Sequence, residues 1–82
     1  MHTVGAFAVI FGEGATVLLC HRTDRDAWNL PGGRVEPNES PCAAVVCEVE
    51  EEVGLHVCVK RLLGVYAVPT KADLVFNFLC VP

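Results

Sequence analysis

Carboxylates crowd the short stretch 48–52, near the end of a segment that reads as a helix. On a helix, Glu48, Glu51 and Glu52 would share one arc, because residues three and four apart are neighbours. Like charges at these spacings cost roughly 0.2–0.5 kcal/mol per pair, and negative charge is also disfavoured at a helix C-terminus. A hard cation such as Mg²⁺ or Mn²⁺ would remove this cost, since carboxylate oxygens are its preferred ligands. The alternative is a solvated helix face.

The helix that would carry these acids has clear start and stop signals. Ser40 is a good N-cap, Pro41 suits the first helical position, and Gly54 suits the position just past the end. We therefore expect a helix over about 41–53. The arc predicted to face the core holds Cys42, Val45, Val46, Val49 and Val53.

Runs of β-branched and aromatic residues predict strands on both sides of this helix. They are expected at residues 3–11, 15–22, 55–68 and 73–81. The first two suggest a hairpin across a glycine-containing turn at 12–14. Residues 31–33, Pro-Gly-Gly, predict a loop without regular structure, where a backbone carbonyl can approach a ligand closely.

Length and composition limit the function classes. With 82 residues and a net charge of −4, the chain has room for one domain and lacks the basic stripe that a nucleic-acid duplex requires. It has neither a leader signal nor an apolar run of the roughly 20 residues that cross a bilayer, so we expect a cytoplasmic protein without membrane contact. Buried, reduced thiols are expected for the five cysteines, Cys20, Cys42, Cys47, Cys58 and Cys80.

From Gly33 onward, the chain resembles the Nudix box of the Nudix hydrolases, the MutT-like family. The pattern is G-x5-E-x7-R-E-U-x-E-E-x-G-U, with U a bulky aliphatic residue. Eight of its nine fixed positions match: Gly33, Glu39, Glu48, Val49, Glu51, Glu52, Gly54 and Leu55. Cys47 stands where the pattern has arginine. The preceding residues 28–33, WNLPGG, also resemble the family's entry to the box.

The resemblance implies an α/β fold of the α+β kind, with a mixed β-sheet and the box as loop–helix–loop. Residues 1–82 would form a single, partial Nudix-like domain, because the family's later strands and C-terminal helix are absent. The strand at 73–81 would then be unprotected or poorly covered. A longer protein would supply the missing cover, and a second copy in a homodimer is the alternative.

The implied activity is hydrolysis of a nucleoside diphosphate linked to another group, a small-molecule substrate, with Mg²⁺ or Mn²⁺ required. A water activated by metal would attack phosphorus. Carried over by position, the Gly33 carbonyl and the side chains of Glu48, Glu51 and Glu52 would hold the cation. Glu48 or Glu52 would be the general base.

Substrate contacts are expected on both sides of the box. Glu39 would hold the loop or bind the metal through water, by resemblance to the family. Arg34 adjoins the metal loop and is preferred over Arg22 and Arg25 as a partner for substrate phosphates. Trp28 would either pack beneath the loop or stack on a base.

Cys47 is the departure with the clearest chemical consequence. In the family, the arginine pairs with glutamates of the box, which a neutral thiol cannot do. We expect looser ligand geometry and reduced activity, although a tolerated substitution at a partly exposed position would have no effect. Two alternatives to an enzyme follow: a Nudix-fold nucleotide- or metal-binding module with weak or no catalysis, and a metal-free structural fragment.

Overall fold

Helix α1 spans Pro41–Val53, the bounds predicted from its capping residues. In the computed structural model, which describes residues 3–24, 26–68 and 73–82, the Ser40 hydroxyl accepts a hydrogen bond from the Ala43 N–H at 3.1 Å. At the other end, Gly54 adopts a left-handed φ of 72°, and its N–H donates to the Glu50 carbonyl at 3.0 Å. Local capping therefore fixes where the acid-bearing helix begins and ends.

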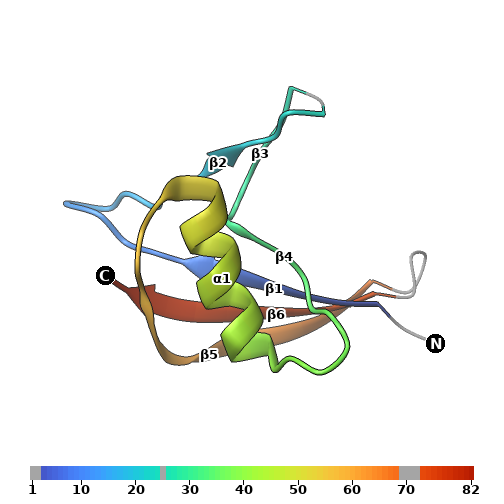
Figure 1. Ribbon diagram of the computed structural model, residues 1–82. Helices are drawn as coiled ribbons and strands as arrows, with labels where there is room; N and C mark the ends of the chain where they lie inside the picture. The colour runs from blue at the N-terminus through green and yellow to red at the C-terminus, as the bar shows by residue number, and fades with distance from the viewer. Residues whose placement is uncertain (1–2, 25, 69–72) are drawn as a thin grey trace.

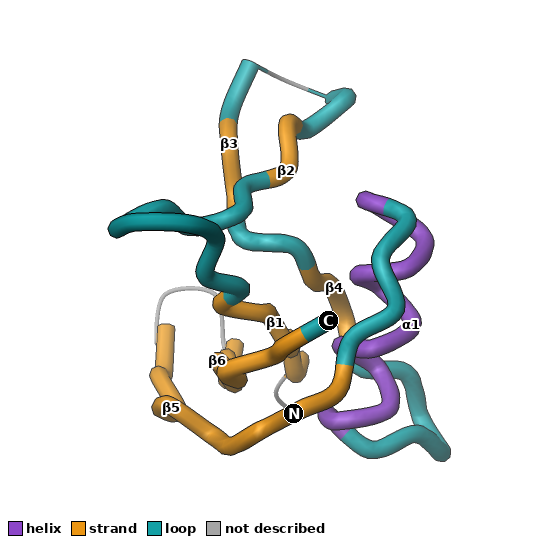
Figure 2. The backbone as a smooth tube through the Cα atoms, turned by 90° about the vertical axis from the view of Figure 1, so that its left-hand side faces the viewer, coloured by secondary structure: helices purple, strands orange, loops and turns teal. Residues whose placement is uncertain are grey.

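A mixed four-stranded sheet lies behind the helix, in the order β4-β1-β6-β5 (Figure 1). Its strands are β1 (Thr3–Val9), β4 (Gly32–Arg34), β5 (Cys58–Val68) and β6 (Asp73–Val81). Strands β1 and β6 are parallel, and the other two pairs are antiparallel. The prediction of a mixed sheet with a single box helix is confirmed for the described residues. Figure 2 shows the helix covering one side of this sheet.

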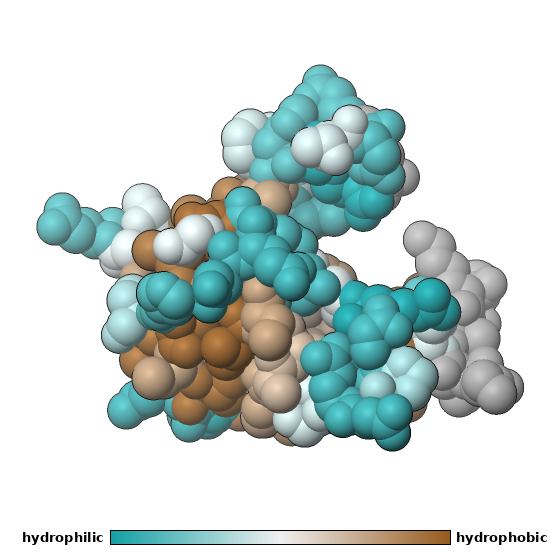
Figure 3. Space-filling view, viewed as in Figure 1, coloured by the Kyte–Doolittle hydropathy of each residue, from teal (hydrophilic) through white to brown (hydrophobic). Residues whose placement is uncertain are grey.

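The segment between β1 and the helix differs in part from the predicted hairpin and loop. The predicted hairpin is present over a few residues: Phe11 and Val17 form an antiparallel bridge, the Gly12 N–H donates to the Thr16 carbonyl, and the Leu18 N–H donates to the Ile10 carbonyl. Strand β2 (Cys20–His21) pairs instead with β3 (Trp28–Asn29), and this two-stranded hairpin is separate from the main sheet. It stands off from the rest of the molecule and presents mainly hydrophilic surface (Figure 3).

Gly32 and Gly33, two of the three residues of the predicted loop at 31–33, belong to strand β4, which is a correction to the sequence prediction. Gly32 and Gly33 pair with Phe7 and Ala6 of β1. A Cβ at Gly32 would lie 2.2 Å from the Ala6 carbonyl oxygen, and the Gly32 φ is 153°. Glycine is therefore required there because the β1 backbone approaches too closely for any side chain.

The core lies between α1 and one face of the sheet. Its buried members are Ala6, Ala8, Ile10, Ala44, Val45, Val49, Val57, Phe78 and Cys80. The small side chains of Ala6 and Ala8 allow the helix to pack close to β1. The predicted core positions Val45 and Val49 are confirmed, whereas Cys42 is exposed and Ala44 is buried instead.

Two further sequence expectations need correction. All five cysteines are free, but among them only Cys80 is buried, and Cys42, Cys47 and Cys58 are exposed. Strand β6, which was expected to be poorly covered, is paired on both edges by β1 and β5 and buries Phe78 beneath the helix layer. Within the described residues, no helix is both long and apolar enough to cross a bilayer.

The N-cap of α1 offers a test of what holds the acid-bearing helix in place. Replacing Ser40 by alanine removes the acceptor for the Ala43 N–H and should cost about 1 kcal/mol of unfolding free energy. For a chain of this size, the midpoint of thermal unfolding should fall by about 4–8 °C. Circular dichroism melts would measure this shift. Ser40→Asp keeps a capping oxygen and should stay within about 2 °C of the parent; an equal fall for both variants would contradict the capping role.

Candidate active site

A cleft of about 730 Å³ opens beside the C-terminal half of α1. The predicted acids Glu48, Glu51 and Glu52 line it, together with Gly32 and Gly33 of β4. Residues 20–24 and Asn29 of the β2–β3 hairpin line it as well. The structure therefore brings the predicted glutamates and the glycine segment into one cleft, although they are far apart in the sequence.

Two contacts join the helix acids to strand β4. A Cβ at Gly33 would lie 2.9 Å from the Glu48 carboxyl carbon and 3.1 Å from each carboxyl oxygen, so any side chain there would displace this carboxylate from its position. The Gly32 N–H donates a hydrogen bond to Glu52 Oε1 at 3.1 Å. The glycine pair therefore creates the space for one acid and a hydrogen-bond donor for another.

The acids also act on one another electrostatically. Burial raises the pKa of the Glu48 carboxyl above its ordinary value, and the negative charges of Glu51 and Glu52 raise it further. A hydrogen bond with Glu52 adds to the same shift. The last turn of α1 contains no basic residue to offset these charges. The metal-free cluster is thus held together against its own repulsion.

The donor set fits a hard divalent cation. It consists of the carboxylate oxygens of the helix and the backbone of two glycines, which have no side chain to block a ligand. Oxygen ligands of this kind suit Mg²⁺ or Mn²⁺. In residues 3–24, 26–68 and 73–82, no three His, Cys, Asp or Glu side chains already converge into a closed metal-binding group. A cation held by these carboxylates would complete its shell with water and substrate oxygens.

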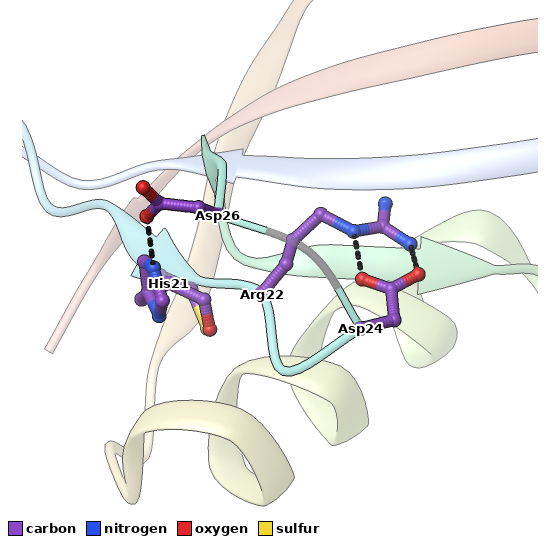
Figure 4. Close-up of polar contacts among 5 residues, drawn as sticks. His21, Arg22, Asp24 and Asp26 are labelled. Atoms are coloured by element: carbon purple, nitrogen blue, oxygen red, sulfur yellow. Dashed lines mark hydrogen bonds and ion pairs between the residues drawn. The ribbon is translucent and has the colours of Figure 1, made fainter.

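Two pairs of polar side chains lie on the β2–β3 hairpin, Arg22 with Asp24 and His21 with Asp26 (Figure 4). Arg22 donates from Nε and Nη2 to the two carboxylate oxygens of Asp24, at 2.7 and 2.6 Å. This hydrogen bonding and the charge of Asp24 raise the pKa of the Arg22 guanidinium, and the charge of Glu52 also favours its charged form. His21 Nε2 lies 3.0 Å from Asp26 Oδ1. The cleft thus has acids on the helix side and an arginine paired with an aspartate on the hairpin side.

The predicted substrate-binding residues lie in different places. Arg34 is outside the glutamate cleft, so its position next to the glycines in sequence does not place it beside the acids. Glu39 is also outside the cleft, where its carboxylate accepts from the Glu36 N–H at 2.9 Å and closes the turn before the helix. Trp28 is 62% exposed and its ring lies against that of His21, so packing beneath the loop is wrong. Base stacking by Trp28 stays a prediction.

Sequence reasoning missed several residues that line the cleft. Phe7, His21 and Asp24 belong to no recognised motif, and Asn29 lies in the WNLPGG segment without a predicted role. Arg22 was weighed, but ranked below Arg34. Alternation along a strand assigns side chains to two faces, yet a sequence does not show which face a short hairpin turns toward a helix that follows it in the chain.

Comparison with known proteins gives the family. A family model described as the NUDIX domain matches residues 1–81. The chain belongs to the Nudix family.

Its relatives and structural neighbours agree with this assignment. A Bacillus subtilis (strain 168) protein, provisionally named an 8-oxo-dGTP diphosphatase, is 42% identical over 73 residues, which cover 89% of this chain and 49% of that protein. A "MutT-like protein" of Streptomyces ambofaciens is 38% identical over 82 residues, covering 100% of this chain and 53% of its own length. This Nudix chain therefore spans about half the length of these curated relatives.

A solved structure also resembles it closely. The crystal structure of an ADP-ribose pyrophosphatase from Streptococcus suis 89-1591 superposes with a TM-score of 0.87 at 31% identity, covering 99% of this chain and 60% of that one. The fold described above, with its single box helix on a mixed sheet, is therefore the fold of Nudix proteins of known structure.

Within the Nudix box, Cys47 is exposed on α1, directly before Glu48. The structure places no basic residue in the last turn of the helix that could take over the role of the family's arginine. The carboxylates of this box therefore lack a counter-charge from their own helix segment.

Charge repulsion among the glutamates of the Nudix box predicts that ionised Glu48 destabilises the metal-free fold. Folding raises the pKa of Glu48, so the protonated side chain stabilises the fold at low pH. This contribution is lost as the pH rises from the ordinary pKa of a glutamate through the raised pKa of the folded state. Glu48→Gln should therefore raise the melting midpoint of the metal-free protein at pH 7 by roughly 1–4 °C, from a few tenths of a kcal/mol per relieved pair.

Thermal melts at pH 4 and pH 7, without metal and with Mg²⁺, would measure this effect. The gain from Glu48→Gln should shrink at pH 4, where the parent carboxyl is largely protonated. Glu13→Gln removes the same charge from the exposed turn at 12–14 and serves as the control. A metal-free Glu48→Gln protein that melts below the parent at pH 7 would contradict the prediction.

Proposed function

We propose that this Nudix chain is the catalytic part of a metal-dependent hydrolase of nucleoside diphosphates linked to another group. The observation that supports it most strongly is the cleft in which Glu48, Glu51 and Glu52 meet the glycines of β4. Names of similar proteins point the same way, since 8-oxo-dGTP, ADP-ribose and UDP-X each contain a nucleoside diphosphate joined to a further group.

The box residues would divide the work as follows. The Gly33 carbonyl and the carboxylates of Glu48, Glu51 and Glu52 would hold Mg²⁺ or Mn²⁺. When bound, the cation would neutralise the diphosphate and lower the pKa of a bound water. Glu48 or Glu52 would accept the proton of the water that attacks phosphorus. The hydrogen bond from the Gly32 N–H orients Glu52 toward the cleft before any ligand arrives.

Arg22 takes the place of Arg34 as the candidate contact for phosphate in this cleft. Its guanidinium lines the cleft and is held in a fixed orientation by two hydrogen bonds to Asp24. Only part of the donor fork is used by Asp24, and a phosphate oxygen is a good acceptor for the remaining N–H groups. Phosphate would therefore lie between the helix acids with their cation and this arginine.

A binding module with weak or no catalysis is the second candidate. Cys47 supports it, because an exposed thiol cannot brace the glutamates as an arginine would. A cation would still bind under this alternative, but the attacking water would be positioned poorly.

A turnover assay separates these two candidates. The 82-residue chain and its Cys47→Arg variant would be incubated with Mg²⁺ or Mn²⁺ and with ADP-ribose, dinucleoside polyphosphates, nucleotide sugars and nucleoside triphosphates. Release of products would be followed by chromatography. We expect cleavage by the parent and a severalfold higher rate with Cys47→Arg, because an arginine would fix the carboxylates in place.

The matched controls are two glutamates of the same helix. Glu52→Gln should lower the rate by about 100-fold or more. Glu50→Gln removes the same charge, but Glu50 lies outside the cleft and its carboxylate is 3.1 Å from His56 Nδ1, so the rate should stay within about twofold. Equal effects of Glu52→Gln and Glu50→Gln on the rate would contradict the proposal that the glutamate cleft is the active site. Metal binding without turnover in any variant would favour the binding module.

A further inference from the structure

Strand β5 forms a long edge of the main sheet. It has 11 residues, which makes it the longest strand in the described part of the chain, and among the described strands it pairs only with β6. Figure 1 shows β5 along the side of the sheet farthest from the β2–β3 hairpin. An edge strand of this length presents a row of backbone N–H and C=O groups with which another strand can pair.

Large apolar side chains are concentrated on this edge. Ten of them are exposed in the described residues, and four of these lie within five consecutive positions: Leu62, Leu63, Val65 and Tyr66. We call these four residues the edge patch. Each is 43–55% exposed, because helix α1 packs chiefly on β1 and β4 and leaves β5 largely uncovered. A cluster of exposed apolar side chains marks an interaction surface, whereas scattered single ones do not.

The edge patch presents apolar atoms on both faces of the sheet. Leu62 pairs with Phe78, which is buried on the face that carries the helix. Tyr66 pairs with Val75 of β6 and therefore projects from the other face. A ligand bound to one face would cover only part of the edge patch. A strand that pairs along the edge adds side chains to both faces and covers all of it.

Only the first half of β5 has the features that protect a free edge, such as charged side chains and bulges. Lys60 and Arg61 supply the charges, and both register shifts in the pairing with β6 fall within residues 59–64. From Gly64 to Val68 the register is regular, and the strand contains neither a charged residue nor a proline. This second half of the edge is therefore open to pairing.

Charge favours one direction for the pairing of two such edges. The cationic residues Lys60 and Arg61 lie near the start of β5, whereas Asp73 pairs with Val68 at its end. In an antiparallel arrangement, the cationic start of each strand lies near the acidic end of its partner. A parallel arrangement would place the two cationic starts side by side, which is unfavourable. The antiparallel arrangement also has the two-fold symmetry of most homodimers.

We propose that a second copy of this chain pairs antiparallel along the β5 edge, so that two four-stranded sheets join into one continuous sheet. The edge patch of one copy then packs against the edge patch of the other. Strand β4 and the glutamate cleft lie at the opposite edge of the sheet, so both clefts stay open in the dimer. The pairing does not rest on the proposed function.

The size of the contact predicts a weak dimer. An 11-residue strand is roughly 36 Å long. Two such edges, each with four half-exposed apolar side chains, would bury about 1,200 Å² in total, at the low end of specific interfaces. Transient association is typical of contacts of this size. We therefore expect a dissociation constant of about 1–100 µM.

Sedimentation velocity measures this association directly. The 82-residue chain would be studied from about 1 µM to about 500 µM, a range that spans the expected dissociation constant. We expect the weight-average mass to rise from that of the monomer toward twice that value. Amide shifts of the ¹⁵N-labelled chain over the same range would locate the contact, and the largest changes are expected in residues 62–68.

Single lysine substitutions provide matched variants. Tyr66→Lys places a charge within the edge patch and should raise the dissociation constant by about tenfold or more. Leu19→Lys introduces the same charge at a residue that is 45% exposed and lies outside the main sheet, so the dissociation constant should stay within about twofold. Thermal melts would confirm that both variants are folded.

A charge reversal tests the direction of pairing, and its result stands if Tyr66→Lys fails to fold. Arg61→Glu changes the start of β5 and leaves the edge patch intact. In the antiparallel arrangement the new carboxylate lies near Asp73 of the second copy, so the dissociation constant should rise by about threefold or more. In a parallel arrangement the same substitution would relieve repulsion between the cationic starts and lower the dissociation constant.

Three results would overturn the proposal. A monomer mass at every concentration would show that the β5 edge does not pair. Equal weakening by Tyr66→Lys and Leu19→Lys, or amide shifts centred on residues 11–19, would place the contact elsewhere. Tighter association of the Arg61→Glu protein would contradict the antiparallel arrangement. Turnover by a chain that stays monomeric would refute the dimer and leave the hydrolase in place.

Discussion

The close approach of Glu48 to Gly33 is the constraint on which the rest of the site depends. A carboxylate on the helix sits against a strand residue that has no side chain, at a distance where a Cβ would overlap it. This approach requires β4 to pair with β1, and α1 to pack on the alanines of β1. The site is therefore a product of sheet pairing and helix packing, and not of the box sequence alone. Any change that lifts the helix from β1 would also separate the acids from the glycines.

The same constraint explains an electrostatic cost that the fold tolerates. Three acids lie at the helix end where the backbone dipole disfavours them, with no basic residue in the last turn. One of them is partly buried, which adds desolvation. The stability needed to hold this arrangement comes from the apolar side of the same helix, where Val45 and Val49 are fully buried. Opposite faces of α1 thus have opposite effects on stability, and a cation would relieve the unfavourable one.

Local signals made the helix predictable from the sequence, because a cap acts on residues only a few positions away. Ser40 and Gly54 therefore located both ends. The box pattern likewise identified the acids that share the cleft. Strand β4 could not be predicted in this way, since two glycines have low intrinsic strand propensity and are held in place by backbone pairing with β1. For the same reason, the adjacency of Arg34 to Gly33 in the sequence does not place Arg34 in the glutamate cleft, because successive residues of a strand face opposite sides.

The edge position of β4 determines how the glutamate cleft is built. Strand β4 is three residues long and pairs with β1 on one side, and no further strand of the described sheet pairs with its other side. From this edge, the Gly32 N–H holds Glu52, and the space beside Gly33 admits Glu48. A large side chain at Gly33 would displace the Glu48 carboxylate, whereas one at Gly32 would collide with the β1 backbone and weaken the strand pairing on which the cleft depends.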